Sequence, residues 1–181
     1  MIFIVSGPGG VGKGTVVSRL VQMRPDVHLS RSWTSRPRRA GEPGNAYVFV
    51  SREQFMAQVE AGGFLEWTEF PGTGHLYGTP LLEGGAGDAV VLEIDLDGAR
   101  QVKLLHPDSV LILISVASPE VQKERLRRRG DDEASVSRRM EVGAKELEEG
   151  LRLADHVVLN DEVDRAAAEV AGIIDARRGG A

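Results

Sequence analysis

The residues that could do chemistry begin at a glycine-rich loop near the N-terminus. Residues 7–13 read Gly-Pro-Gly-Gly-Val-Gly-Lys, which matches the pattern G-x-x-x-x-G-K. Glycines at these positions let the backbone curl so that successive N–H groups point at phosphate oxygens, and a following helix N-terminus adds positive potential. Lys13 would supply a mobile charge for the β and γ phosphates. The loop therefore predicts binding of a nucleoside triphosphate.

The neighbours of this loop support that prediction. An apolar run at residues 1–6 reads as a buried strand, and residues 13–23 follow it with helical spacing of apolar side chains. Gly14 stands where such loops usually carry the Ser or Thr that holds Mg²⁺, and Thr15 brings a hydroxyl one residue later. We expect the metal to be held mainly by phosphates and water, with Thr15 nearby. A glycine turn with a solvated lysine is the weaker alternative.

Arginines form two clusters on a chain that is acidic overall. The first consists of Arg36, Arg38 and Arg39, and the second lies between residues 125 and 139. Guanidinium groups pair with phosphate through parallel hydrogen bonds, so small anionic ligands suit this pattern. The second cluster adjoins a glycine and acidic residues at 130–133, which fits a mobile lid over a phosphate. Spacing alone favours a simpler alternative for it, a pair of exposed amphipathic helices.

The composition narrows the class of protein. The chain has 181 residues, with 22 basic and 27 acidic side chains and a net charge of -5, which argues against nucleic acid or an anionic membrane as its partner. There are no cysteines, so disulfides and thiolate metal sites are excluded. No apolar run approaches the length of a signal peptide or a membrane span. We expect a cytoplasmic protein without an obligatory protein partner.

The elements that must position these residues alternate between strands and helices. The predicted strands are residues 1–6, 27–33, 47–50, 64–69, 89–94, 110–116 and 156–159. The predicted helices are residues 13–23, 52–61, 98–105, 119–129, 133–153 and 161–177. This alternation predicts an α/β fold with a parallel sheet flanked by helices. Residues 83–88, Glu-Gly-Gly-Ala-Gly-Asp, predict a flexible segment.

One stretch, residues 35–70, breaks the alternation with short strands around one helix, and it predicts a small α+β subdomain inserted into the core. We expect one domain over residues 1–181. Its core would comprise about 1–34, 80–124 and 152–181, its inserted subdomain about 35–79 and its helical lid about 125–151.

Several segments in order resemble the guanylate kinase family, and the resemblance covers nearly the whole chain. Residues 32–42 read Ser-Trp-Thr-Ser-Arg-Pro-Arg-Arg-Ala-Gly-Glu and are followed by Tyr-Val-Phe-Val at 47–50. This is similar to the family signature T-T-R-x-P-R-x-G-E with a later Tyr and F-V. The other matching segments are Phe-Leu-Glu-Trp at 64–67, Tyr-Gly-Thr at 77–79, Glu-Ile-Asp-Leu-Asp-Gly-Ala at 93–99, and residues 125–130, 138–140 and 160–161.

The resemblance implies a P-loop NTPase-type fold in which the γ-phosphate of ATP passes to GMP, and to dGMP, with Mg²⁺ present. The implied ATP site comprises Gly7, Pro8, Gly9, Gly10, Val11, Gly12, Lys13, Gly14, Thr15 and Asn160. The implied catalytic residues are Lys13, Arg39, Arg125, Arg129 and Arg139, the last three in the lid. The partners would be these small molecules alone.

The acceptor site implied by the resemblance has two parts. The GMP phosphate would be held by Ser32, Arg36, Arg39, Tyr47 and Tyr77. The guanine would face Glu66 and Thr79, with Glu93 assisting at its edge. Asp95, after an apolar strand, would organise Mg²⁺ together with Thr15, although a lone carboxylate there is more often a helix cap.

Three departures from the family pattern fall in the acceptor half. Residues 42–47 are one residue shorter than expected, the loop 70–76 is longer, and the stretch 79–93 is about one helical turn of ~3.6 residues short. Two alternatives therefore stay open. One is another monophosphate kinase, acting on AMP or a ribosyl bisphosphate, and the other is a non-catalytic guanylate-kinase-like module that binds phosphopeptides.

Overall fold

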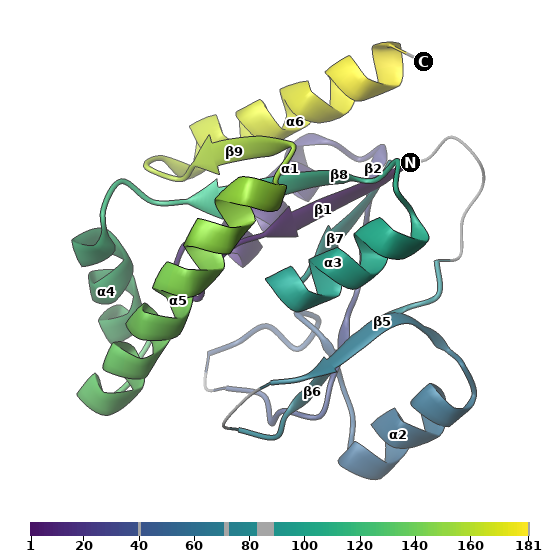
Figure 1. Cartoon of the computed structure of the whole chain (residues 1–181), viewed down its shortest axis with the longest axis vertical. Coiled ribbons are helices and arrows are strands. Elements are labelled where there is room, and N and C mark those ends of the chain that lie inside the picture. Colours follow the sequence, from purple (N-terminus) through teal and green to yellow (C-terminus); the bar gives the residue numbers. More distant parts are fainter. Residues whose placement is uncertain (40, 71–72, 83–88, 181) are drawn as a thin grey trace.

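The computed structural model describes residues 1–39, 41–70, 73–82 and 89–180 (Figure 1). The strands are β1 (Ile2–Ser6), β2 (Val27–Ser30), β3 (Trp33–Thr34), β4 (Val48–Phe49), β5 (Phe64–Glu69), β6 (Leu76–Pro80), β7 (Ala89–Glu93), β8 (Val110–Ser115) and β9 (His156–Leu159). The helices are α1 (Lys13–Met23), α2 (Arg52–Glu60), α3 (Leu96–Leu105), α4 (Pro119–Arg128), α5 (Glu133–Leu153) and α6 (Val163–Gly179). The segment 83–88, predicted to be flexible, lies outside the described residues.

The first sheet is parallel throughout and has the order β2-β7-β1-β8-β9. Its central strands are apolar along their length, as strands covered on both faces must be. Because strand side chains alternate, Phe3 and Val5 pack into a core with α1 and α6, while Ile4 packs into a second core with α3. The prediction of a parallel sheet flanked by helices is confirmed.

The second sheet has the order β4-β3-β6-β5 and is mostly antiparallel. Figure 1 shows it beside the first sheet, with α2 on its far side. The helix α2 begins at a capping box in which Ser51 and Gln54 satisfy each other's backbone N–H groups. Phe55 of α2 is fully buried and stacks on Phe64 of β5, with ring centroids 4.5 Å apart. This aromatic pair fixes α2 against the second sheet.

Two strand predictions were wrong. Residues 27–33 were expected to form one strand, but β2 ends at Ser30 and β3 begins at Trp33 in the other sheet. The chain changes sheets there because Val48 donates its N–H to the Ser32 carbonyl and draws the chain toward β4. The strand β6 was not predicted, since its Gly78 and Pro80 are poor strand formers. It forms because both its edges are paired.

The helices α4 and α5 form an antiparallel pair at the carboxyl edge of the first sheet (Figure 1). Ser118 caps α4 and Asp132 caps α5, each accepting from a backbone N–H in the first turn. Gly130 turns the chain between them with φ of 89°. In the part of the chain that the structure describes, no helix combines the length and the apolar character required of a membrane span.

Candidate active site

The glycine-rich loop lies at the carboxyl edge of the first sheet, between β1 and α1. Gly7, Gly10 and Gly12 have positive φ, a conformation that other residues rarely adopt. A Cβ at Gly7 would lie 2.4 Å from the Ile114 carbonyl oxygen, so β8 also requires glycine there. The Lys13 ammonium donates to the Gly7 carbonyl at 2.5 Å and lies 3.4 Å from that of Pro8. The Lys13 side chain thus folds back over the loop, where a bound phosphate would compete with the Gly7 carbonyl for the ammonium group.

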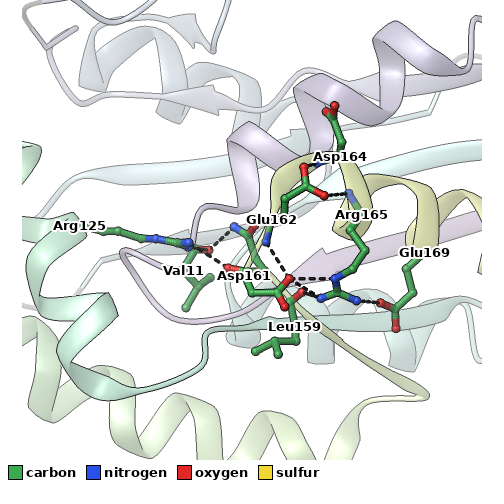
Figure 2. Close-up of polar contacts among 9 residues, drawn as sticks. Val11, Arg125, Leu159, Asp161, Glu162, Asp164, Arg165 and Glu169 are labelled. Carbon is green, nitrogen blue, oxygen red and sulfur yellow. Dashed lines mark hydrogen bonds and ion pairs between the residues drawn. The ribbon is translucent and has the colours of Figure 1, made fainter.

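Three side chains hold the loop from outside through its carbonyl groups. Asn160 donates Nδ2–H to the Val11 carbonyl at 2.7 Å. Arg125 donates to the same carbonyl and to that of Asn160, each at 2.9 Å (Figure 2). Gln122 of α4 donates to the Gly9 carbonyl at 2.7 Å. Arg125, predicted to lie in the lid, is therefore already bound to the phosphate loop.

The turn that carries Asn160 is itself braced by Arg165 (Figure 2). The Arg165 guanidinium donates to the Leu159 carbonyl and pairs with Asp161, so it grips the residues on both sides of Asn160. Asn160 is 2% exposed, and its Oδ1 has no hydrogen-bond partner among the described residues. A buried acceptor of this kind is costly unless a ligand satisfies it. Asn160 thus keeps one acceptor that no described residue satisfies.

Arg36, one of the two arginines predicted to hold the GMP phosphate, follows β3 and is bound to a carboxylate. Arg36 is 7% exposed and pairs through both Nη atoms with Glu42, at 2.7 and 3.0 Å. Its Nε is buried and has no partner in the described part of the chain. The rings of Tyr47 and Phe49 flank the guanidinium at 5.5 and 5.7 Å. Glu42, to which no role was assigned from the sequence, therefore orients Arg36.

The two predicted tyrosines and Arg39 lie around Arg36. Tyr47 and Tyr77 are in edge-to-face contact, with ring centroids 6.1 Å apart. Burial raises the pKa of Tyr47 well above its usual value, so its phenol stays a hydrogen-bond donor at neutral pH. Burial and then the charge of Arg36 lower the pKa of Arg39, and Arg139 of α5 acts in the same direction. The positive charges of Arg39, in the loop between β3 and β4, and of Arg139 therefore act on each other. Ser32 is buried at the start of this segment.

Glu66 and Thr79 occupy paired positions on β5 and β6. The Thr79 hydroxyl donates to Glu66 Oε1 at 2.6 Å, and both residues are buried. The other oxygen, Oε2, lies 2.6 Å from where a Cβ on Gly98 would be, so glycine in the first turn of α3 leaves room for the Glu66 carboxylate in this orientation. Burial raises the Glu66 pKa to about 7, opposed by the Thr79 hydrogen bond and aided by the Asp95 charge. The structure brings this predicted pair together.

Glu66→Gln is expected to stabilise the ligand-free protein at pH 8 and to change little at pH 4.5. Because the folded-state pKa of Glu66 is raised from 4.5 to about 7, the native state holds a proton that the unfolded chain loses between these values. Above pH 7 the native state carries the cost of a buried charge, at most about 3 kcal/mol, which glutamine avoids. Thermal unfolding from pH 4.5 to 8 measures this. A stability difference that does not grow with pH would contradict it.

Two further predicted carboxylates lie near Lys13. Glu93, at the end of β7, is close to the loop, since a Cβ on Gly14 would meet its Oε1 at 3.3 Å. Burial raises the Glu93 pKa, and Lys13 opposes that shift. Asp95 caps α3 by accepting from the Gly98 N–H at 2.8 Å, and burial raises its pKa too. No role was assigned to Glu146 of α5 from the sequence. Burial raises the Glu146 pKa, the charge of Lys13 opposes that shift, and the charge of Asp95 adds to it.

Thr15 and Asp95, the residues predicted to organise Mg²⁺, fit an ion whose ligands are mostly phosphate oxygens and water. Among the described residues, no cluster of three or more His, Asp or Glu side chains is placed to hold a metal ion. Thr15 is exposed in the first turn of α1, and Asp95 contributes a single carboxylate partly engaged as a cap. Mg²⁺ readily keeps several waters and takes phosphate oxygens as ligands. The donor set therefore suits a nucleotide-bound ion, and it offers no protein cage.

The lid arginines differ in their surroundings. Arg139 pairs with Asp131 at 3.4 Å and reaches the loop, because its Nη1 is 3.6 Å from where a Cβ on Gly9 would be. Arg129 follows the last residue of α4 and is exposed. Of these three arginines, Arg125 and Arg139 thus reach the phosphate loop in this conformation, and Arg129 is exposed.

Two cavities among the described residues lie away from this site. One of about 430 Å³ and one of about 120 Å³ share Arg177 in their lining. Both lie at the amino edge of the first sheet, where Met1 and Ser109 precede β1 and β8. Convergence of polar groups, and not cavity size, identifies the candidate site.

This chain is similar to known proteins over the phosphate loop and over the second sheet. A family model for guanylate kinase matches residues 1–177. The guanylate kinase of Synechococcus sp. (strain JA-3-3Ab) is 41% identical over 179 residues, covering 96% of this chain and 81% of that protein. That of Symbiobacterium thermophilum is 39% identical over 184 residues, covering 98% and 86%.

A solved guanylate kinase structure, from Anaplasma phagocytophilum, matches with a TM-score of 0.81 at 27% identity, covering 98% of this chain and 86% of that one. The match in sequence and in structure runs from the phosphate loop through the second sheet to α6. The chain therefore belongs to the guanylate kinase family, a class of ATP:GMP phosphotransferases.

Proposed function

We propose that this chain transfers the γ-phosphate of ATP to GMP at the carboxyl edge of the first sheet, giving ADP and GDP. One observation carries the proposal. The α3 N-terminus lies beside Glu66, because a Cβ on Gly98 would be 2.6 Å from Glu66 Oε2 and 3.4 Å from Oδ1 of the capping Asp95, and the charge of Lys13 in the phosphate loop also acts on Asp95. A donor phosphate at Lys13 and an acceptor base at Glu66 would thus lie on either side of the α3 N-terminus, as a direct transfer requires.

The donor half would bind ATP through the loop, residues 7–15. Its N–H groups and the α1 N-terminus would surround the phosphates, and Lys13 would leave the Gly7 carbonyl for the β and γ oxygens. Asn160 would use its unpartnered Oδ1 toward the adenine or ribose. Mg²⁺ carried by the phosphates, with Asp95 and Thr15 beside it, would supply charge neutralisation there.

The acceptor half would bind GMP through the second sheet. Arg36 and Arg39, with Ser32, Tyr47 and Tyr77, would hold the phosphate, and Glu42 fixes the orientation of the Arg36 guanidinium. Glu66 would accept hydrogen bonds from guanine, with Thr79 orienting it and Glu93 at the edge. This division makes residues of about 35–79 the GMP-binding subdomain and about 125–151 the lid. The same groups suit dGMP, because none is reserved for the ribose 2′-hydroxyl.

ADP release with GMP, dGMP, AMP, CMP and UMP in turn tests the function. GMP and dGMP should be phosphorylated and the others turned over far more slowly. Equal rates with AMP would favour the other monophosphate kinases, and binding of phosphopeptides without ADP release would favour a non-catalytic module. All proposed groups come from one chain, so no protein partner is needed. We propose a cytoplasmic location, where ATP and GMP are available.

Arg139→Ala is expected to lower kcat at least about tenfold while leaving the Kd for GMP alone nearly unchanged, since several arginines share the stabilisation of the transferring phosphoryl group. Its Nη1 lies beside Gly9, so it would act on the phosphates of bound ATP and not on the guanine. Steady-state kinetics and calorimetric GMP titration measure the two quantities. Arg138→Ala, on the exposed side of α5, is the matched control. A collapse of GMP affinity with kcat preserved would instead place Arg139 in the acceptor site.

A further inference from the structure

Gln122 is a buried polar residue whose surroundings are those of the phosphate loop. It is 6% exposed, one turn before the fully buried Leu126 on the inner face of α4. Its Nε2 donates to the Gly9 carbonyl at 2.7 Å. Its Cγ lies 3.3 Å from where a Cβ on Gly10 would be. An apolar side chain would fill this position equally well, so the amide requires a separate explanation.

The Gly9 carbonyl needs a partner because the peptide between Gly9 and Gly10 can rotate easily. Neither residue has a Cβ, and Gly10 has φ of 87°, so several orientations of this peptide are sterically accessible. The peptide is trans, so its C=O and the Gly10 N–H point in opposite directions. Holding the carbonyl toward α4 therefore turns the N–H away from α4. The reverse orientation would present an oxygen, and not a donor, to a phosphate.

The same amide also contacts the lid helix. A Cβ on Gly143 of α5 would lie 2.9 Å from the Gln122 Nε2 and 3.2 Å from the Pro8 Cβ. Glycine at 143 thus lets α5 approach both the loop and the amide that holds it. A movement of α5 would therefore displace Gln122 and, through its hydrogen bond, the Gly9–Gly10 peptide.

We propose that Gln122 is a positioning residue, which holds the Gly9–Gly10 peptide with its N–H toward the triphosphate and ties the phosphate loop to α4 and α5. It acts with Arg125 and Asn160, which hold the Val11 carbonyl in the same way and so orient the Gly12 N–H (Figure 2). The proposal rests on the proposed ATP site at the loop. According to this proposal, Gln122 strengthens ATP binding through the phosphate loop and does not affect GMP binding.

Gln122→Met tests the proposal, since methionine keeps the length and packing of the side chain and removes the donor. The readouts are kcat and KM for each nucleotide, calorimetric Kd values for a β,γ-imido ATP analogue and for GMP, and thermal unfolding. We expect kcat/KM for ATP and affinity for the analogue to fall by about tenfold, as for the loss of one buried hydrogen bond. The Kd for GMP should change little, and the Tm should fall by about a few degrees, because the Gly9 carbonyl loses its donor in the absence of ATP as well.

Gln58→Met is the matched control, because Gln58 also donates from Nε2 to a glycine carbonyl, that of Gly63, but does so beside the second sheet. It should leave ATP binding unchanged. Gln122→Glu is the second variant; it keeps the shape but sets a carboxylate against the Gly9 carbonyl, so ATP affinity should fall further than in the methionine variant.

A folded Gln122 variant with wild-type ATP affinity would overturn the proposal. So would equal losses for ATP and GMP together with a lowered Tm, or failure of both variants to fold, since these indicate a purely structural role. If wild-type enzyme released no ADP with any acceptor yet bound the ATP analogue, the proposed function would fail while the Gln122 comparison stayed valid.

Discussion

Lys13→Met is expected to lower kcat/KM for ATP by about 150-fold or more, which corresponds to a loss on the order of 3 kcal/mol of transition-state stabilisation. In the ligand-free structure the Lys13 ammonium is bound to the Gly7 carbonyl, so it already lies within the loop. Methionine keeps the length of the chain but offers no charge to the phosphates. The positive charge of Lys13 stabilises the transferring phosphoryl group most strongly in the transition state. The substitution should therefore lower kcat more than it weakens ATP binding.

The Lys13 measurement combines steady-state kinetics with thermal unfolding. Lys103→Met is the matched control, because Lys103 also donates to a backbone carbonyl, that of Ser109, and pairs with Asp155 at the opposite edge of the sheet. It should lower the Tm and leave kcat unchanged. A folded Lys13→Met enzyme with nearly wild-type turnover would exclude the loop as the phosphate site.

Glu66→Gln is expected to lower kcat/KM for GMP by about 100-fold and to raise the efficiency with AMP relative to GMP. Guanine presents adjacent N1–H and N2–H donors, which an ionised carboxylate accepts as a pair. Thr79 already occupies one side of Oε1, so the carboxylate is fixed in orientation before the base arrives. Glutamine retains one acceptor and replaces the other with an N–H that would meet guanine donors. Adenine offers an acceptor at N1, so AMP is penalised less.

The pH dependence supplies a second test of Glu66. Its ligand-free pKa of about 7 means that the ionised form, which guanine requires, predominates only above pH 7. The KM for GMP should therefore rise as the pH falls below 7, and this rise should be absent in the glutamine variant. Glu69→Gln on the same strand, whose carboxylate pairs with Arg52 on the surface, is the control and should show neither effect. An unchanged GMP-to-AMP ratio would remove Glu66 from the site.

The phosphate loop and the main sheet could be predicted from sequence because local chemistry determines them. Gly7 to Lys13 require a curled backbone whatever surrounds them, and the apolar runs of β1, β7 and β8 can only be central strands. The helices could be predicted because their apolar spacing and caps lie within the segment itself. Each of these features has its cause within about a dozen residues of the chain.

Features that depend on partners distant in sequence could not be predicted from local pattern. The split after Ser30 and the strand β6 exist only because other strands pair there. Arg125 was assigned to the lid from the sequence, and its contacts with the carbonyls of Val11 and Asn160 join segments that lie far apart in the chain. The neighbours of an arginine in the sequence do not indicate which hydrogen-bond acceptor its side chain will contact in the folded protein.

The sequence by itself determined which groups are available: a phosphate loop with Lys13, clusters of arginine, and a carboxylate at Glu66 between apolar neighbours. Tertiary structure alone decided their state. Burial, aided by the Asp95 charge and opposed by the Thr79 hydrogen bond, raises the pKa of Glu66 to about 7, and a hydrogen bond to the Gly9 carbonyl connects Gln122 of α4 to the phosphate loop. The reason is physical, because desolvation and hydrogen-bond geometry depend on which atoms surround a group in space, and those atoms come from segments far apart in the chain.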